Sequence, residues 1–197
     1  MHTSNSDSRL PRDCEGEDEY YIEKMSEILD EPPNIGPPAH PGKMLDHVYI
    51  GNLDNAEDYD LLPALGITHV LNVAGTRNFD LTRSRYPEKL GITDFLMIPA
   101  EDYEEYDIAE HFHDAISFLD RAKASGGKAM VHCNLGVNRS GAVVAAYMMI
   151  HQRKPLLKVL SDLKSKRAVV LCNTGFRRQL LSTPVAVDYS IRWKRLR

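Results

Sequence analysis

The sequence predicts an α/β fold in which a central, mostly parallel sheet is flanked by helices. One observation is that short apolar segments typical of strands alternate along the chain with longer segments typical of helices. A second is that the strand predicted at residues 128–132 leads through one short loop into an apolar helix at residues 140–150. Parallel strands need helical connections, which place helices over the faces of the sheet.

The earlier part of the chain repeats this alternation. Strands are predicted at residues 47–51, 68–74 and 93–98. Asp54 is a plausible cap for a helix that runs to Leu65, and Gly66 ends it. After the third strand, residues at spacings of three or four form the apolar face of a further helix: Ile108, Phe112, Ile116 and Leu119.

A last long helix is predicted from residue 156. Its core stripe consists of Leu156, Val159, Leu160 and Leu163. The basic residues of this region are expected to point outward, where they form a solvated face or meet acidic flanks of a substrate: Lys158, Lys164, Lys166 and Arg167.

Charge and proline content divide the chain into three parts. Residues 1–41 contain ten acidic and three basic side chains and several prolines, so we expect a largely disordered N-terminal tail with a short helix from Tyr20 to Leu29. Residues 42–184 are expected to form the folded domain, and residues 185–197 a basic C-terminal tail. Two roles are open for the acidic tail: solubility, or binding of a partner or of the basic mouth of a site.

Composition argues against several classes of protein. With 43% hydrophobic and 26% charged residues, the chain resembles ordinary globular proteins. The longest apolar run, Ala142 to Ile150, is far shorter than the ~20 residues of a membrane helix, and no secretory signal is recognisable, so no membrane association is expected. The one short basic tract is the C-terminal tail, and no nucleic-acid partner is expected. Three cysteines form no disulfide framework, which favours the cytoplasm, the nucleus or both.

The loop at residues 133–139, between a strand and a helix, predicts an oxyanion site. Its backbone N–H groups can converge on one point, and the first turn of the helix adds the positive end of its dipole. Gly136 allows the backbone to approach a ligand closely. A ligand such as phosphate is expected to bind Asn134, Leu135, Gly136, Val137, Asn138 and Arg139.

Three side chains add chemistry to this loop. A thiol at a helix N-terminus and beside a cation tends to ionise, so Cys133 is a candidate nucleophile. Arg139 has a planar fork that can hold two phosphate oxygens, and Ser140 can donate a hydrogen bond to the sulfur. A lone cysteine or arginine in such a place is usually a buried thiol or a solvated charge, so each residue by itself is weak evidence for catalysis.

Transfer of phosphate to sulfur also needs a proton donor for the oxygen that leaves. The loop after the third predicted strand lies at the carboxyl edge of the same sheet, where the sites of α/β proteins gather. It supplies five candidate carboxyl groups: Glu101, Asp102, Glu104, Glu105 and Asp107. Residue types alone leave the choice among them open.

The run His132-Cys133-x5-Arg139-Ser140-Gly141 resembles the signature of cysteine-dependent phosphatases. The segments at residues 49–52, 65–74, 173–176 and 179–180 are similar to the catalytic domain of small, atypical dual-specificity phosphatases. The resemblance implies a cysteine-phosphatase fold with a shallow active site. It further implies metal-independent hydrolysis of phosphotyrosine, phosphoserine and phosphothreonine in phosphorylated proteins, through a cysteinyl-phosphate and without a cofactor.

The resemblance also implies roles for single residues. Asp102 stands in the Ala-x-Asp setting of the family's general acid, and Cys133 in that of the nucleophile. Arg139 and the loop amides are expected to stabilise the phosphoryl charge, with Ser140 assisting the sulfur. His132 and Asn173 are expected to support the site from behind, and no metal ligand is expected.

Two departures from the family pattern keep alternatives open. Asn138 stands where serine is most frequent, and Cys172 stands where proline commonly precedes Asn173. Asn138 is shared with RNA 5′-triphosphatases of the same superfamily, which makes that activity the main alternative. A non-catalytic module that binds phosphoproteins is a further alternative, although such modules usually lack the nucleophile or the arginine.

Overall fold

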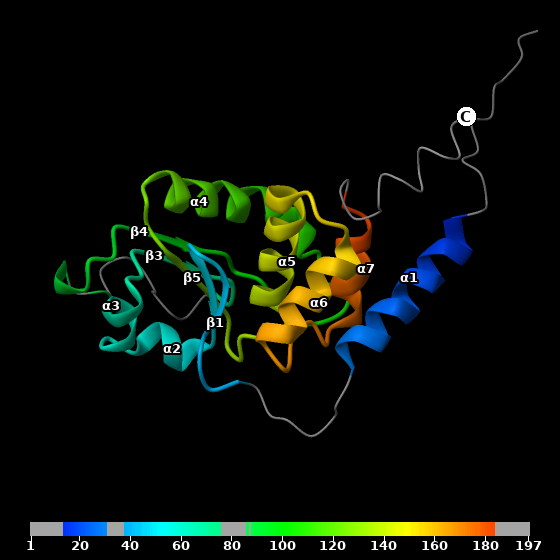
Figure 1. Cartoon of the computed structure of the whole chain (residues 1–197), viewed down its shortest axis with the longest axis horizontal. Helices are drawn as coiled ribbons and strands as arrows, with labels where there is room; N and C mark the ends of the chain where they lie inside the picture. Colours follow the sequence, from blue (N-terminus) through cyan, green and yellow to red (C-terminus); the bar gives the residue numbers. More distant parts are fainter. Residues whose placement is uncertain (1–13, 31–37, 76–85, 87, 184–197) are drawn as a thin grey trace, which may run out of the picture.

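The computed structural model describes residues 14–30, 38–75, 86 and 88–183, and its centre is a five-stranded sheet (Figure 1). The strands are β1 (Gly42–Leu45), β2 (Val48–Gly51), β3 (His69–Asn72), β4 (Asp94–Met97) and β5 (Ala129–His132). Their order in the sheet is β1-β2-β5-β3-β4. β1 is antiparallel to β2, and all other neighbours are parallel. The predicted mostly parallel sheet flanked by helices is therefore confirmed.

Both faces of the sheet are apolar because successive residues of its central strands enter two different cores. In β5, Val131 belongs to the larger core and Met130 to the smaller one, and in β2 the same holds for Ile50 and Tyr49. Figure 1 shows helices on both sides of the sheet. Those that supply the larger core are α4 (Phe112–Ala124), α5 (Arg139–Gln152), α6 (Leu156–Lys166) and α7 (Thr174–Leu181). Those near the smaller core are α2 (Leu53–Glu57) and α3 (Leu61–Leu65).

Helix α5 is the central helix of the larger core. Its residues are buried from Arg139 to Met149, and it contacts α4, α6, α7, β2 and β5. A helix that is apolar on all sides requires such surroundings. The packing fixes the N-terminus of α5, and with it the preceding loop, at the carboxyl edge of the parallel strands.

The segment after β2 differs from the prediction of one helix from Asp54 to Leu65. It forms the two short helices α2 and α3, with residues 58–60 between them. A continuous helix would bring the ring of Pro63 against the preceding turn, which explains the interruption. The cap of α2 is Asn52 rather than Asp54, since Asn52 Oδ1 accepts a hydrogen bond from Asn55 N at 2.8 Å. Strand β1 was not predicted.

Residues 14–30 lie in the acidic N-terminal segment, and the helix predicted there from Tyr20 to Leu29 begins earlier, at Cys14. They contain helix α1 (Cys14–Leu29), which packs against α6 and α7 (Figure 1). Met25 and Leu29 enter the larger core, while Glu23 and Glu27 remain exposed. The acidic composition therefore belongs to one face of an amphipathic helix. The other parts of the two predicted tails, residues 1–13, 31–37 and 184–197, lie outside the described residues.

Candidate active site

The site begins at the carboxyl end of β5, where residues 133–138 lead into α5. Three carbonyl groups of this loop accept hydrogen bonds from groups outside it. The pairs are Asn134 O with Leu53 N (3.1 Å), Gly136 O with Arg167 Nε (2.7 Å) and Val137 O with Leu171 N (3.1 Å). In a trans peptide the next N–H points away from such a carbonyl. The N–H groups of Leu135, Val137 and Asn138 therefore face the inner side of the loop.

The shape of the loop depends on Gly136. Its φ angle is +66°, in the left-handed region that favours glycine. A Cβ atom at this position would overlap the carbonyl oxygen of Gly51 and the guanidinium of Arg167. The glycine expected from the sequence to permit a close approach thus lets the loop itself pack against β2 and Arg167.

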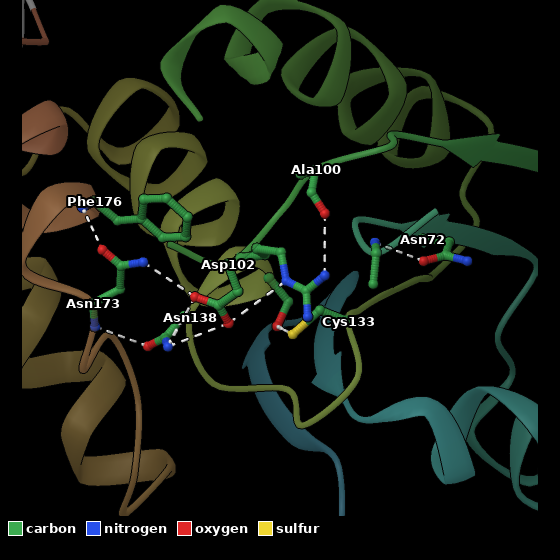
Figure 2. Close-up of polar contacts among 10 residues, drawn as sticks. Asn72, Ala100, Asp102, Cys133, Asn138, Asn173 and Phe176 are labelled. Carbon is green, nitrogen blue, oxygen red and sulfur yellow. Dashed lines mark hydrogen bonds and ion pairs between the residues drawn. The ribbon is translucent and has the colours of Figure 1, made fainter. Parts of the chain in front are cut away.

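Cys133 lies at the start of the loop and is almost completely buried. Its Sγ is 3.4 Å from Ser140 Oγ in the first turn of α5, and Ser140 is buried as well (Figure 2). An ionised sulfur can accept a hydrogen bond from this hydroxyl group. The structure therefore brings the predicted nucleophile and the predicted assisting hydroxyl into contact at a helix N-terminus.

Arg139 is the first residue of α5, and only 7% of it is exposed. Its Nη1 donates a hydrogen bond to Ala100 O at 3.1 Å, and its Nε lies 3.6 Å from Asp102 Oδ2 (Figure 2). The bond to Ala100 fixes the plane of the guanidinium. The arginine that closes the Cys133 loop is thereby joined to the segment that carries the five candidate acids.

Asp102 is the candidate acid that contacts the Cys133 loop. Its carboxylate accepts hydrogen bonds from Asn138 Nδ2 at 3.1 and 3.3 Å and from Asn173 Nδ2 at 3.1 Å (Figure 2). All five candidate acids are exposed residues, so Asp102 differs from Glu101, Glu104, Glu105 and Asp107 by its contacts and not by burial. Two of them have other partners: Asp107 accepts from Ala109 N, and Glu104 lies 4.0 Å from Arg178.

Asn138 and Asn173 join the Cys133 loop to helix α7. The backbone N of Asn173 donates to Asn138 Oδ1 at 3.0 Å, and Asn173 Oδ1 caps α7 by accepting from Phe176 N at 3.1 Å. Asn138, which departs from the family's usual serine, thus uses both ends of its side-chain amide inside this network. Asn173, for which a supporting role is predicted, thus contacts both Asn138 and Asp102.

His132 is the last residue of β5 and is buried directly before Cys133. Its carbonyl oxygen accepts a hydrogen bond from Val73 N at 2.8 Å. In the neighbouring strand β3, Asn72 Oδ1 accepts from Ala74 N at 2.8 Å (Figure 2). Both residues therefore order the ends of the strands that carry the site.

Arg167 corrects the prediction of an outward-facing basic residue. It is 2% exposed, and besides Gly136 O its guanidinium binds His40 O at 3.1 Å and Ile50 O at 3.3 Å. Burial lowers the pKa of Arg167, while the charge of the Cys133 sulfur acts in the opposite direction. The sequence held one signal: Arg167 follows Leu163 by four residues and so continues the buried stripe of α6.

Within the part of the chain that the structure describes, no group of three or more His, Cys, Asp and Glu side chains is placed to hold a metal ion. No described helix combines the length and apolarity needed to cross a membrane.

A buried thiol in an amide-lined loop that an arginine closes is the arrangement expected of cysteine-dependent phosphatases. Comparison with protein families gives the narrower class. Residues 48–184 match the family described as dual specificity phosphatase, catalytic domain. The chain therefore belongs to the dual-specificity phosphatase family, as its motifs predicted.

Individual relatives agree with this result. The chain is 38% identical over 144 residues to dual specificity protein phosphatase 26 of Homo sapiens, a match that covers 73% of this chain and 66% of the relative. It is 35% identical over 156 residues to protein phosphatase Slingshot homolog 1 of Mus musculus, covering 79% of this chain and 14% of that protein. The crystal structure of DUSP15 matches with a TM-score of 0.63 and 30% identity, covering 73% of this chain and 86% of that one.

Proposed function

We propose that this chain is a metal-independent phosphoprotein phosphatase that hydrolyses phosphotyrosine, phosphoserine and phosphothreonine through a cysteinyl-phosphate. One observation carries the proposal: Asp102 is held 3.6 Å from Arg139, at the loop that contains Cys133. A nucleophile, an anion clamp and a proton donor therefore meet in one place. The names of the relatives, which are protein phosphatases, support the same reaction.

In the first step, the ionised Sγ of Cys133 attacks phosphorus. The S–P bond forms as the P–O bond to the substrate side chain breaks, and the protonated carboxyl group of Asp102 gives its proton to the leaving oxygen. The inward N–H groups of the loop and the free donors of Arg139 stabilise the charge on the phosphoryl oxygens. Because Arg139 is fixed through Ala100, little reorganisation accompanies the transfer.

In the second step, water hydrolyses the cysteinyl-phosphate. The carboxylate of Asp102 accepts a proton from the water as the O–P bond forms and the S–P bond breaks. The hydroxyl group of Ser140, 3.4 Å from Sγ, donates a hydrogen bond to the departing thiolate. Inorganic phosphate is released, and Asp102 is again protonated for the next cycle.

Phosphorylated proteins are the partners that this reaction requires. A thiolate enzyme also works only where thiols stay reduced, so the proposal includes the cytoplasm, the nucleus or both. Asn138 had suggested RNA 5′-triphosphatase activity, but its contacts with Asp102 and Asn173 give it a role that does not involve RNA. Partner binding by the acidic N-terminal segment stays a prediction.

The test is phosphate release in EDTA from matched phosphotyrosine and phosphothreonine peptides and from a 5′-triphosphate RNA. We expect the wild type to release phosphate from both peptides, and the Cys133→Ser variant to release none. Release from RNA alone would replace the proposal with the triphosphatase activity. Binding of the peptides without release would favour a non-catalytic module.

A further inference from the structure

Arg177 of helix α7 joins the end of helix α1 to the segment behind the active site. It is 2% exposed, and its Nε donates a hydrogen bond to Leu171 O at 2.6 Å. Its Nη2 donates to Asp30 Oδ1 at 2.6 Å, while Nη1 donates to Asp30 Oδ2 and to Ser26 Oγ, each at 3.3 Å. One buried guanidinium thus holds two segments that lie far apart in the sequence.

The segment that Arg177 holds is itself fastened to the active site. Leu171 N donates to Val137 O of the Cys133 loop at 3.1 Å, and two residues later Asn173 contacts Asn138 and Asp102. Leu171 has a φ of +55°, a conformation that side chains other than glycine rarely adopt. A residue keeps this strained backbone conformation only where neighbouring groups stabilise it. For Leu171, the stabilising contacts are the hydrogen bonds of its N–H to Val137 O and of its carbonyl to Arg177 Nε.

The residue directly after helix α1, Asp30, supplies the carboxylate from outside the matched family domain, which begins at residue 48. Met25 and Leu29 seat the helix in the core, and Lys164 Nζ donates to Leu29 O at 2.7 Å. This packing of α1 places the Asp30 carboxylate against the guanidinium of Arg177, whose charge it neutralises. The hydrogen bond and charge of Arg177 in turn lower the pKa of Asp30, which keeps the carboxylate ionised.

We propose that Asp30 and Arg177 are positioning residues, through which the docking of helix α1 sets the placement of Asp102. The inference rests on the proposed function, in which Asp102 is the proton donor. Without Asp30, Arg177 becomes a buried charge without a counter-ion and leaves its place. Leu171 and Asn173 then lose their support, and Asp102 loses one of its two amide donors. Cys133 and Arg139 are affected less, because their contacts with Ser140 and Ala100 do not involve this segment.

Removal of Asp30 should therefore slow proton donation by Asp102 more than nucleophilic attack by Cys133. A phosphothreonine peptide has an alkoxide leaving group that needs the acid, whereas a fluorinated methylumbelliferyl phosphate has a good leaving group that hardly does. We expect Asp30→Ala in the full chain to lower the ratio of the two kcat/KM values, peptide over aryl phosphate, by about tenfold or more. A partly unfolded sample lowers both rates equally, so the ratio is insensitive to loss of folded protein.

The matched control is Glu27→Ala, which removes the exposed ion pair with Lys24 on the same helix and leaves Arg177 untouched. Its ratio should equal that of the wild type. An equal loss on both substrates in Asp30→Ala, or no loss at all, would overturn the inference.

Hydrogen exchange gives a readout that does not need turnover. In Asp30→Ala, but not in Glu27→Ala, amides at residues 101–107 and 170–173 should exchange faster than in the wild type. If the wild type hydrolysed neither substrate, the proposed function would fail, and exchange alone would decide the coupling. Unchanged exchange in these two segments would then reject it.

Discussion

Arg167 and Arg177 act alike although they lie on different sides of the active site. Each is 2% exposed, and each donates from Nε to a carbonyl oxygen that shapes the site, Gly136 O at 2.7 Å and Leu171 O at 2.6 Å. Burial of a guanidinium costs free energy unless its N–H groups donate hydrogen bonds. These contacts therefore fix the positions of the Cys133 loop and of the segment before α7. The placement of Cys133, Arg139 and Asp102 thus depends on two buried arginines that lie outside the Cys133 loop.

The Asp30–Arg177 pair predicts a dependence of stability on pH. The pKa of Asp30 is lowered in the folded state by its contacts with Arg177. The stabilisation from this pair is therefore fully present above the unfolded pKa of about 4 and is lost as the pH falls through the lower folded value. The free energy of unfolding of the wild type should exceed that of Asp30→Asn by a constant amount above about pH 4, and the difference should shrink below it.

Urea unfolding of both proteins between neutral and acidic pH measures this difference. Asp162, whose pKa is lowered by Lys154 and Lys158, contributes equally to both proteins and cancels. Glu27→Gln in helix α1 serves as the control, because it removes one carboxylate and leaves the contacts of Arg177 in place. Parallel curves for the wild type and Asp30→Asn would show that the pair adds no pH-dependent stability.

Helix α7 and the Asp102 segment lie so close that the contact requires a glycine. Gly175 is the second residue of α7, and a Cβ atom there would overlap the carbonyl of Glu104. Gly175→Ala should therefore push the Asp102 segment outward and lower kcat/KM for a phosphothreonine peptide by roughly 10²-fold, as displacements of about 1 Å do. Steady-state kinetics with that peptide measures the effect.

Gly16→Ala is the matched control for this substitution. Gly16 lies in helix α1, and a Cβ atom there would meet nothing within 4 Å. Alanine should stabilise the helix by about 0.5–1 kcal/mol and leave the kinetics unchanged. If Gly175→Ala had wild-type kinetics, the Asp102 segment could move away from α7 without loss of activity, and this prediction would be wrong.

The order of strands and helices could be predicted because each central element carries its own apolar period. The break between α2 and α3 could have been read from Pro63, whereas β1 is only four residues long and pairs by its position beside β2. Helix α1 was underestimated because its acidic face dominates the composition, although Met25 and Leu29 have helical spacing. Local sequence patterns thus predicted the central strands and helices better than the edge strand β1 and the N-terminal helix α1.

The active site was predictable where its residues are adjacent in sequence. Cys133, Arg139 and Ser140 lie within eight residues, so the sequence could be compared directly with the signature of a known family. Asp102 stands among five carboxyl groups of one loop, and only a resemblance could favour it before the contacts with Asn138 and Asn173 were known. The burial of Arg177 depends on α1 and the segment before α7, which no local pattern reveals.

At the scale of the molecule, the larger core of the described residues joins helix α1 to the helices and strands of the matched domain. α1, α6 and α7 meet on one side of α5, while the Cys133 loop lies at its N-terminus (Figure 1). Helix α1, which lies outside the matched domain, therefore packs into the same core as the helix that follows the Cys133 loop. The central claim of the proposed mechanism is that the phosphoryl group is transferred to Cys133 as a covalent intermediate.

The most direct measurement is to trap that intermediate. Wild type and Asp102→Asn are mixed in EDTA with the fluorinated methylumbelliferyl phosphate, whose good leaving group lets the intermediate form without the acid. The samples are quenched within milliseconds and mapped by mass spectrometry. We predict a phosphate on Cys133, at higher occupancy in Asp102→Asn because water is no longer activated, and none in Cys133→Ser. Phosphate release that continues in Cys133→Ser, or turnover by the wild type with no phosphate ever found on Cys133, would contradict the proposed mechanism.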